Sequence, residues 1–208
     1  MKKFFLLLTV FFLLDSQSHA LTGLGLGVRA GMVSNYDSPE LNALFDAPFV
    51  LKGKKIEDMN MLGIHLKIGA LPVIDLEVSG EYFWKTEDFS FQFVDYENPS
   101  VYDTASGEFK IEDYSLSATA KYVFPTAGVK PYVGAGSGLH VIRYGNPGPG
   151  PFLENQTKPS CHFCVGALLD VPVIPLDAFA EGRYSLIQTE NKATTFFTWM
   201  LGATLNLP

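Results

Sequence analysis

The sequence predicts an all-β fold, an eight-stranded antiparallel up-and-down transmembrane β-barrel. Eight segments of roughly ten residues alternate apolar side chains with small or charged ones, and a period of two is typical of β-strands. The gaps between these segments are alternately long and short, as in barrels that cross an outer membrane. A third observation is an export leader at the start of the chain.

The leader is expected over residues 1–20 as a cleavable secretory signal peptide. Lys2 and Lys3 form a basic start, residues 4–14 are an unbroken apolar run, and Ser18-His19-Ala20 is a small-residue cleavage site. The apolar run is too short for a spanning helix, which needs about 20 residues. Residues 21–208 are therefore expected to form one outer-membrane barrel domain after export.

Four strands are expected in the first half of the domain. Over 24–32, leucine, valine and alanine alternate with glycine and one arginine; over 62–70, leucine and isoleucine alternate with glycine, histidine and lysine. Over 74–84, an apolar and aromatic row opposes aspartate, glutamate and serine. Over 110–124, tyrosine, leucine and alanine oppose serine, threonine and lysine. Each segment has the length that a tilted strand needs to cross a bilayer.

The second half repeats this scheme. Over 133–141, apolar residues oppose three glycines and a histidine, and over 163–169 they form a further alternating row. Over 177–185, charged residues and one phenylalanine oppose alanine, glycine and tyrosine; over 197–207, aromatic residues and leucine oppose threonine, glycine and asparagine. Eight strands bring the first and last strands together as neighbours.

The size of the side chains predicts which row faces inward. An eight-stranded barrel has an interior only wide enough for side chains to fill it, so the bulky row must face lipid and the glycine-rich row must face the lumen. Buried charges of both signs must pair. We therefore expect a closed, salt-bridged polar lumen formed by Arg29, His65, Lys67, Asp75, Glu77, Glu81, Lys121, Glu181 and Arg183.

Aromatic residues cluster near the strand ends, where membrane interfaces favour them. One cluster is expected at each interface, although aromatic residues are also common in any β-sheet. The first comprises Tyr82, Trp84, Tyr114, Tyr184, Phe197 and Trp199, and the second comprises Tyr122, Phe124 and Tyr132.

The connections predict the orientation of the barrel. Those at 33–60, 86–109 and 143–160 are long and that at 188–193 is moderate, whereas those at 71–73, 125–129 and 170–175 are short. Long connections of outer-membrane barrels lie outside the cell. The alternation of residues 89–93 predicts that the third strand extends beyond the membrane into an acidic loop suited to surface contact. The chain has a formal net charge of −7, which disfavours a nucleic-acid partner.

Cys161 and Cys164 are the only cysteines. In an extended strand, residues three apart point to opposite faces and lie too far apart to bridge. They are either packing residues or a loop-edge disulfide formed in a turn before the strand. A zinc site would need a second pair of ligands, which the sequence does not supply. No metal or cofactor is expected.

The barrel resembles the small eight-stranded outer-membrane proteins typified by the OmpA transmembrane domain and OmpX-like proteins. The resemblance covers residues 21–208 and rests on strand count, loop alternation and two stretches, Val-Gly-Ala-Gly-Ser-Gly at 133–138 and Ala-Phe-Ala-Glu-Gly-Arg-Tyr at 178–184. It implies a bacterial outer-membrane location. It also implies outer-membrane lipid, periplasmic chaperones and the barrel-assembly machinery as partners, with an unknown extracellular ligand.

Three classes of function remain open. The leading hypothesis is a non-enzymatic barrel with structural, adhesive or surface-contact roles, because no catalytic constellation is evident. A lipid A deacylase-like enzyme would need a serine beside a histidine, and Ser137 and His140 lie on opposite faces of their strand. A soluble lipocalin-like carrier would need the apolar row to face inward, and the first strand lacks the Gly-x-Trp that lipocalins usually show.

Overall fold

The computed structural model of the 208-residue chain describes residues 23–38, 51–53, 56–71, 73–94, 102–126, 128–145, 154–171, 175–188 and 193–207. The expected leader, residues 1–20, lies outside the described residues. Within the described ranges, no helix is long and apolar enough to cross a membrane.

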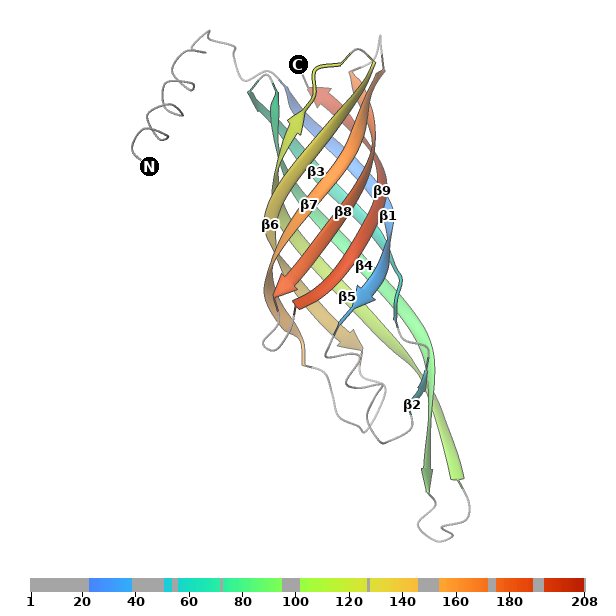
Figure 1. The fold of residues 1–208 in the computed structure, drawn as a ribbon. Helices are drawn as coiled ribbons and strands as arrows, with labels where there is room; N and C mark the ends of the chain where they lie inside the picture. Colours follow the sequence, from blue (N-terminus) through green and yellow to red (C-terminus); the bar gives the residue numbers. More distant parts are fainter. Residues whose placement is uncertain are drawn as a thin grey trace, which may run out of the picture.

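The described residues form a closed antiparallel barrel (Figure 1). Eight strands build its wall, and a ninth, β2, pairs only with the outer part of β4. The strands are β1 (Leu24–Asp37), β2 (Leu51–Gly53), β3 (Met59–Leu71), β4 (Ile74–Val94), β5 (Tyr102–Val123), β6 (Val129–Gly145), β7 (Gln156–Val171), β8 (Leu176–Gln188) and β9 (Ala193–Leu207).

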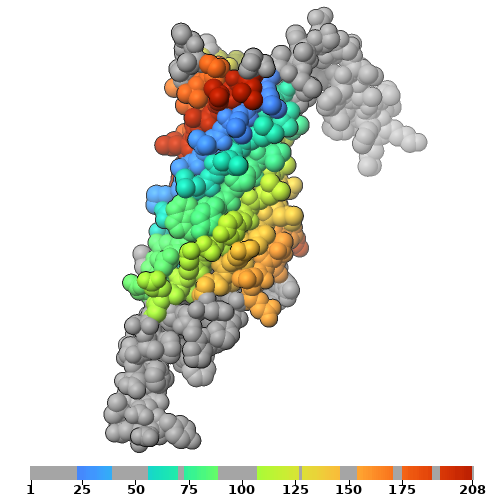
Figure 2. All heavy atoms as spheres, turned by 180° about the vertical axis from the view of Figure 1, so that it is seen from behind, coloured from blue at the N-terminus to red at the C-terminus, as the bar shows by residue number. Residues whose placement is uncertain are grey.

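Closure follows from two ladders. β1 pairs with β9, and β4 pairs with β5, so every wall strand has two antiparallel neighbours. The strands run obliquely around the wall, as the diagonal bands of colour in Figure 2 show. The predicted fold, an eight-stranded antiparallel up-and-down barrel, is confirmed.

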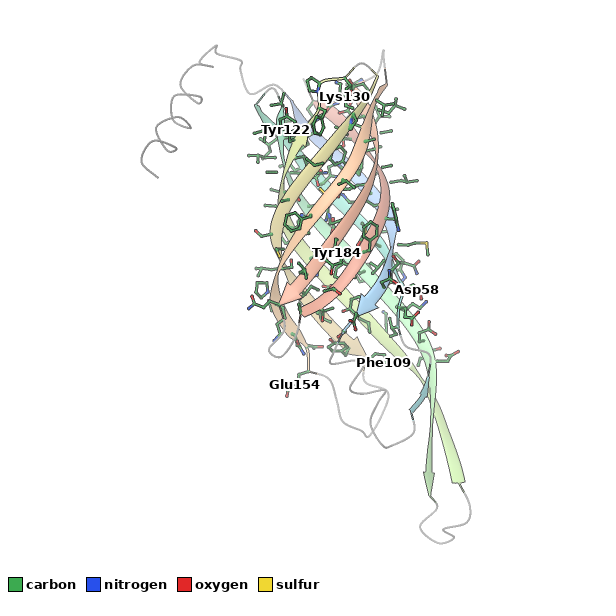
Figure 3. All side chains as sticks on the ribbon, viewed as in Figure 1. Asp58, Phe109, Tyr122, Lys130, Glu154 and Tyr184 are labelled. Carbon is green, nitrogen blue, oxygen red and sulfur yellow. The ribbon has the colours of Figure 1, made fainter. Side chains whose placement is uncertain are left out.

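The two ends of the barrel differ. The short connections β3–β4, β5–β6 and β7–β8 lie at one end, termed the turn end, where β1 begins and β9 ends. The longer connections lie at the other end, termed the loop end. Tyr122 and Lys130 lie near the turn end, and Asp58, Phe109 and Glu154 near the loop end (Figure 3).

β4 and β5 continue past the rest of the wall at the loop end. Their ladder runs without a register shift from Ile74↔Tyr122 to Val94↔Tyr102. The predicted extension of the third wall strand over residues 89–93 is confirmed. β2 was missed because three residues are too few to show a period.

Alternation sorts the two faces of the wall by size. Bulky apolar residues face outward, and Ile64, Trp199 and Leu201 are 63–68% exposed. The inward row carries glycine, charged and hydroxyl residues in the half nearer the turn end. Toward the loop end the inward row becomes apolar.

Inward glycines make room for large inward side chains on neighbouring strands. Gly166 of β7 pairs with Tyr132 of β6, and a Cβ at position 166 would meet the phenol ring of Tyr132 and lie 2.6 Å from the carbonyl oxygen of Ala180. A side chain there would therefore displace Tyr132 or the backbone.

We expect Gly166→Ala to destabilise the barrel by about 1–3 kcal/mol, the usual cost of overpacking. Urea unfolding in phospholipid vesicles, followed by tryptophan fluorescence, measures the loss. Gly80→Ala is the matched control, because its added Cβ meets only Ile64 Cγ1, at 4.0 Å. Equal stability of the two variants would contradict the packing role of Gly166.

Candidate functional site: the lumen

Six buried side chains of alternating charge form a closed cycle of ion pairs across the lumen, termed the charge ring. The side chains come from β1, β4, β5 and β8, and none is more than 8% exposed. In cyclic order they are Arg29, Glu77, Lys121, Glu181, Arg183 and Glu81.

Each carboxylate of the charge ring bridges at least two cations. Glu77 lies 2.5 Å from Arg29 Nη2, without the angles of a hydrogen bond, and 2.9 Å from Lys121 Nζ. Glu181 lies 2.7 Å from Lys121 Nζ and 2.9 Å from Arg183 Nη2.

Glu81 closes the cycle. Its Oε1 lies 2.7 Å from Arg183 Nη1 and 3.3 Å from Arg29 Nη1. Three cations therefore meet three carboxylates, and the charge ring as a whole is neutral.

Glycines on intervening strands let these long side chains approach one another. Gly63 of β3 pairs with Arg29 on one side and with Glu81 on the other. A Cβ on Gly63 would lie 3.1 Å from Arg29 Cγ and 3.0 Å from Glu81 Cγ. The missing side chain therefore opens the space across which Arg29 and Glu81 meet.

Hydroxyl groups satisfy remaining lone pairs of the carboxylates. Ser115 Oγ donates to Glu81 Oε2 at 3.3 Å, and Tyr132 Oη donates to Glu181 Oε2 at 2.8 Å. Such additional hydrogen bonds are what a buried ion pair needs to offset the loss of hydration.

The other three residues expected in the lumen network lie around the charge ring or apart from it. His65 Nδ1 accepts from Arg29 Nε at 3.3 Å, so its proton is on Nε2, which donates to Thr204 Oγ1 at 2.8 Å. Lys67 and Asp75 lie nearer the turn end and are partly exposed. Lys67 Nζ is 2.9 Å from Asp177 and 3.9 Å from Asp75.

The loop-end half of the lumen is apolar, which corrects the expectation of a polar interior throughout. Residues of the inward row pack there into one buried cluster, termed the apolar plug. These positions were missed because the inward row changes from polar to apolar toward the loop end, as in Phe109-Lys110-Ile111-Glu112, where the polar residues face outward. The plug comprises Val33, Tyr36, Ile56, Met59, Met61, Phe83, Phe109, Ile111, Ile142, Tyr144, Ile187, Phe196 and Met200, and the same cluster continues to Phe179, which lies beside Arg29 and Lys121 in the polar half.

His140 joins the apolar plug to the polar half. Its ring lies 6.1 Å from the centroids of both Phe83 and Phe196, and its Nδ1 is 2.7 Å from Asp113 Oδ2. His162 is also buried, with Nε2 2.8 Å from Thr119 Oγ1. Three lumen histidines are thus held by polar partners.

One aromatic residue expected at the membrane interface lies inside the barrel. Tyr132 is only 2% exposed, because the alternation of β6 places it in the same row as Gly134 and Gly136, and Gly166 of β7 leaves room for its ring. The alternation of β6 alone would have predicted that Tyr132 faces the lumen. The other eight aromatics lie on the outer face: Tyr82, Trp84, Tyr114, Tyr122, Phe124, Tyr184, Phe197 and Trp199.

The two cysteines are free, so the loop-edge disulfide is wrong. β7 begins at Gln156, earlier than the sequence indicated, and Cys161 and Cys164 therefore lie within an extended strand and not in a turn. Cys161 is exposed on the outer face and Cys164 is buried in the lumen. Their side chains consequently point to opposite faces.

The described residues contain no group of three or more histidine, cysteine, aspartate or glutamate side chains that could hold a metal ion. Ser137 is exposed on the outer face and His140 is buried on the inner one. The serine and the histidine of the enzyme hypothesis are therefore not brought together.

Neither the family models nor the curated proteins match the sequence. Solved structures do match the fold. Neisserial surface protein A is 18% identical, with a TM-score of 0.54, and the match covers 89% of this chain and 97% of that one. The N-terminal β-barrel domain of Pseudomonas aeruginosa OprF is 15% identical, with a TM-score of 0.52 and coverage of 89% and 99%. This chain has the fold of the small eight-stranded outer-membrane β-barrels.

Removing one cation of the charge ring leaves its carboxylates buried without compensation. We expect Arg183→Met to lower the free energy of unfolding by about 3–5 kcal/mol, because breaking a buried pair costs that much. Urea unfolding in vesicles measures it.

The control is Lys130→Met, which removes the ion pair with Asp170 near the turn end, where both side chains are at least one-third exposed. An exposed pair contributes at most about 1 kcal/mol. If the two variants lost equal stability, the charge ring would not be a stabilising element.

Proposed function

We propose that the protein is a non-enzymatic barrel of a bacterial outer membrane that conducts no solute and presents its loop end, above all the β4–β5 extension, for contact outside the cell. The observation that carries this proposal is the filled lumen: the charge ring and the apolar plug occupy successive levels of one narrow interior. Export by a cleaved leader, assembly by periplasmic machinery and contact with outer-membrane lipid belong to the same proposal.

The outer surface supports insertion in lipid. Large apolar side chains from every wall strand are exposed there, among them Leu26, Leu116 and Phe163, which are 56–62% exposed. A water-soluble carrier would expose this belt of apolar side chains, which runs over every wall strand, to water. Water-soluble proteins rarely expose such large contiguous apolar surfaces. The lipocalin-like alternative is disfavoured for this reason.

The lumen supports a closed barrel. An ion crossing it would have to separate the paired charges of Glu81 and Arg183 and then pass the packed rings of Phe83 and Phe196, whose centroids are 5.9 Å apart. Hydrophobic constrictions block ions by excluding water. Both barriers lie in the same path.

We expect the purified protein, reconstituted in a planar bilayer, to produce no conductance steps, and a general porin incorporated in the same way serves as positive control. Stable conductance would contradict the closed lumen.

We expect carbonate-washed outer membranes to retain the protein, and unboiled samples to migrate differently from boiled ones on SDS gels. Release into the soluble periplasmic fraction would contradict the membrane location.

The enzyme alternative predicts a change in membrane lipid. We expect the acyl-chain content of lipid A, measured by mass spectrometry, to be the same in cells that express the wild-type protein, the His65, His140 and His162 variants, or an empty vector, because these histidines are buried in the lumen. Loss or gain of an acyl chain that depends on a histidine would establish an enzyme.

A further inference from the structure

His65 lies in the lumen between an arginine and a hydroxyl group. In the ladders of β1 it pairs with Gly27, and Gly27 pairs with Thr204 of β9 on its other side. A Cβ on Gly27 would overlap Cε1 and Nε2 of the imidazole ring. The ring therefore lies over the glycine, and its Nε2 reaches Thr204 Oγ1 at 2.8 Å.

The hydrogen bonds of His65 require a neutral ring. Arg29 Nε is always protonated and donates to His65 Nδ1 at 3.3 Å, so Nδ1 is an acceptor and carries no proton. A protonated ring would instead point an N–H of its own at the N–H of Arg29. Protonation would therefore break this hydrogen bond and place two cations in contact.

The charged groups around His65 already balance one another. Those that act most strongly on it from other strands are two cations and two carboxylates: Arg29 of β1, Glu77 of β4, Lys121 of β5 and Glu181 of β8. Both carboxylates bridge cations of the charge ring, which is neutral. Because His65 is only 2% exposed, a proton on its ring would add an uncompensated charge to the interior of the barrel.

Phe179 covers the imidazole ring from β8. The centroids of the two rings are 5.4 Å apart, in an edge arrangement. The Phe179 centroid also lies 5.5 Å from the guanidinium carbon of Arg29 and 5.5 Å from Lys121 Nζ. Protonation of His65 would therefore bring a third positive charge to a phenyl ring that already contacts two.

His140 of β6 has the opposite environment. Its Nδ1 lies 2.7 Å from Asp113 Oδ2, so a carboxylate is in place to pair with this ring when it takes up a proton. Protonation of His140 thus adds a charge beside a partner of the opposite sign, whereas protonation of His65 adds a charge beside an arginine. His140 is consequently a matched control for His65 within the same lumen.

We propose that His65 is an acid-sensitive switch of the lumen, which holds Arg29 in the charge ring when it is neutral and repels Arg29 when it is protonated. In the unfolded chain this histidine takes up a proton near pH 6.5, the ordinary value of about 6.5 for histidine. Because the unfolded state then binds more protons than the folded barrel, the free energy of unfolding falls as the pH falls below that value. This inference concerns the stability of the barrel and goes beyond the proposed function.

The test is urea unfolding of the full chain in phospholipid vesicles at pH 7.5 and at pH 5.5. Between these values an exposed histidine becomes protonated, whereas exposed carboxylates stay ionised. The amide of His65→Gln offers an acceptor to Arg29 and a donor to Thr204 but takes up no proton. On acidification, we expect the folding equilibrium constant of the wild type to fall by a factor about tenfold larger than that of His65→Gln, because pH 5.5 lies about one unit below the ordinary value for histidine.

His140→Gln serves as the control, because it also removes a buried histidine from the lumen but one that a carboxylate faces. This variant should lose at least as much stability on acidification as the wild type does. If it were as acid-resistant as His65→Gln, burial alone would explain the effect and the role assigned to Arg29 would be wrong.

An equal loss of stability in the wild type and in His65→Gln would overturn the proposal. Should His65→Gln not fold, nitrogen-15 NMR of the wild-type barrel decides the question: the ring of His65 should remain neutral at pH 5.5, with its proton on Nε2. A doubly protonated ring in the folded barrel at that pH would contradict the switch. The bilayer and fractionation experiments at neutral pH test the closed lumen and the membrane location separately.

Discussion

The narrow interior of an eight-stranded barrel is the constraint on which this structure depends. Side chains must fill it completely, yet it has no room for eight bulky rows. The chain meets both conditions by placing glycine opposite large inward residues, as Gly63 does between Arg29 and Glu81 and as Gly166 does beneath Tyr132. Glycine therefore determines which inward side chains can meet across the lumen.

The charge ring couples distant parts of the sequence. Glu77 and Glu81 belong to one strand, whereas Glu181 and Arg183 belong to another about one hundred residues away. Because each carboxylate contacts at least two cations, the effect of one substitution depends on the others, and the energies of single variants will not add. Three cations and three carboxylates balance within the ring, and each of the six charges has partners of the opposite sign on both sides. This explains how six buried charges are tolerated in one layer.

Much of the wall could be predicted from alternation alone, since a period of two fixes both the strand and the face of each residue. Pairings across the lumen could not, because they depend on register and on the curvature of the closed sheet. Tyr132 could have been placed from the sequence. The alternation of β6 puts it in the inward row, but its position near the strand end, level with other aromatic residues, led to the wrong prediction that it lies at the membrane interface. Met59, Met61 and Ile142 were missed because an inward row that changes from polar to apolar looks like the end of a strand.

The unbroken ladder between β4 and β5 has a mechanical consequence. The two strands that extend beyond the wall at the loop end, β4 and β5, also carry Glu77, Glu81 and Lys121 within the barrel. No hinge in sequence or register separates the two parts. Ladder hydrogen bonds lie perpendicular to the strands, so a pull along both extended strands loads their ladders with β3 and β6 in shear, many bonds at once. A force on the extension would thus be transmitted to the barrel wall and, through the wall, to the surrounding lipid.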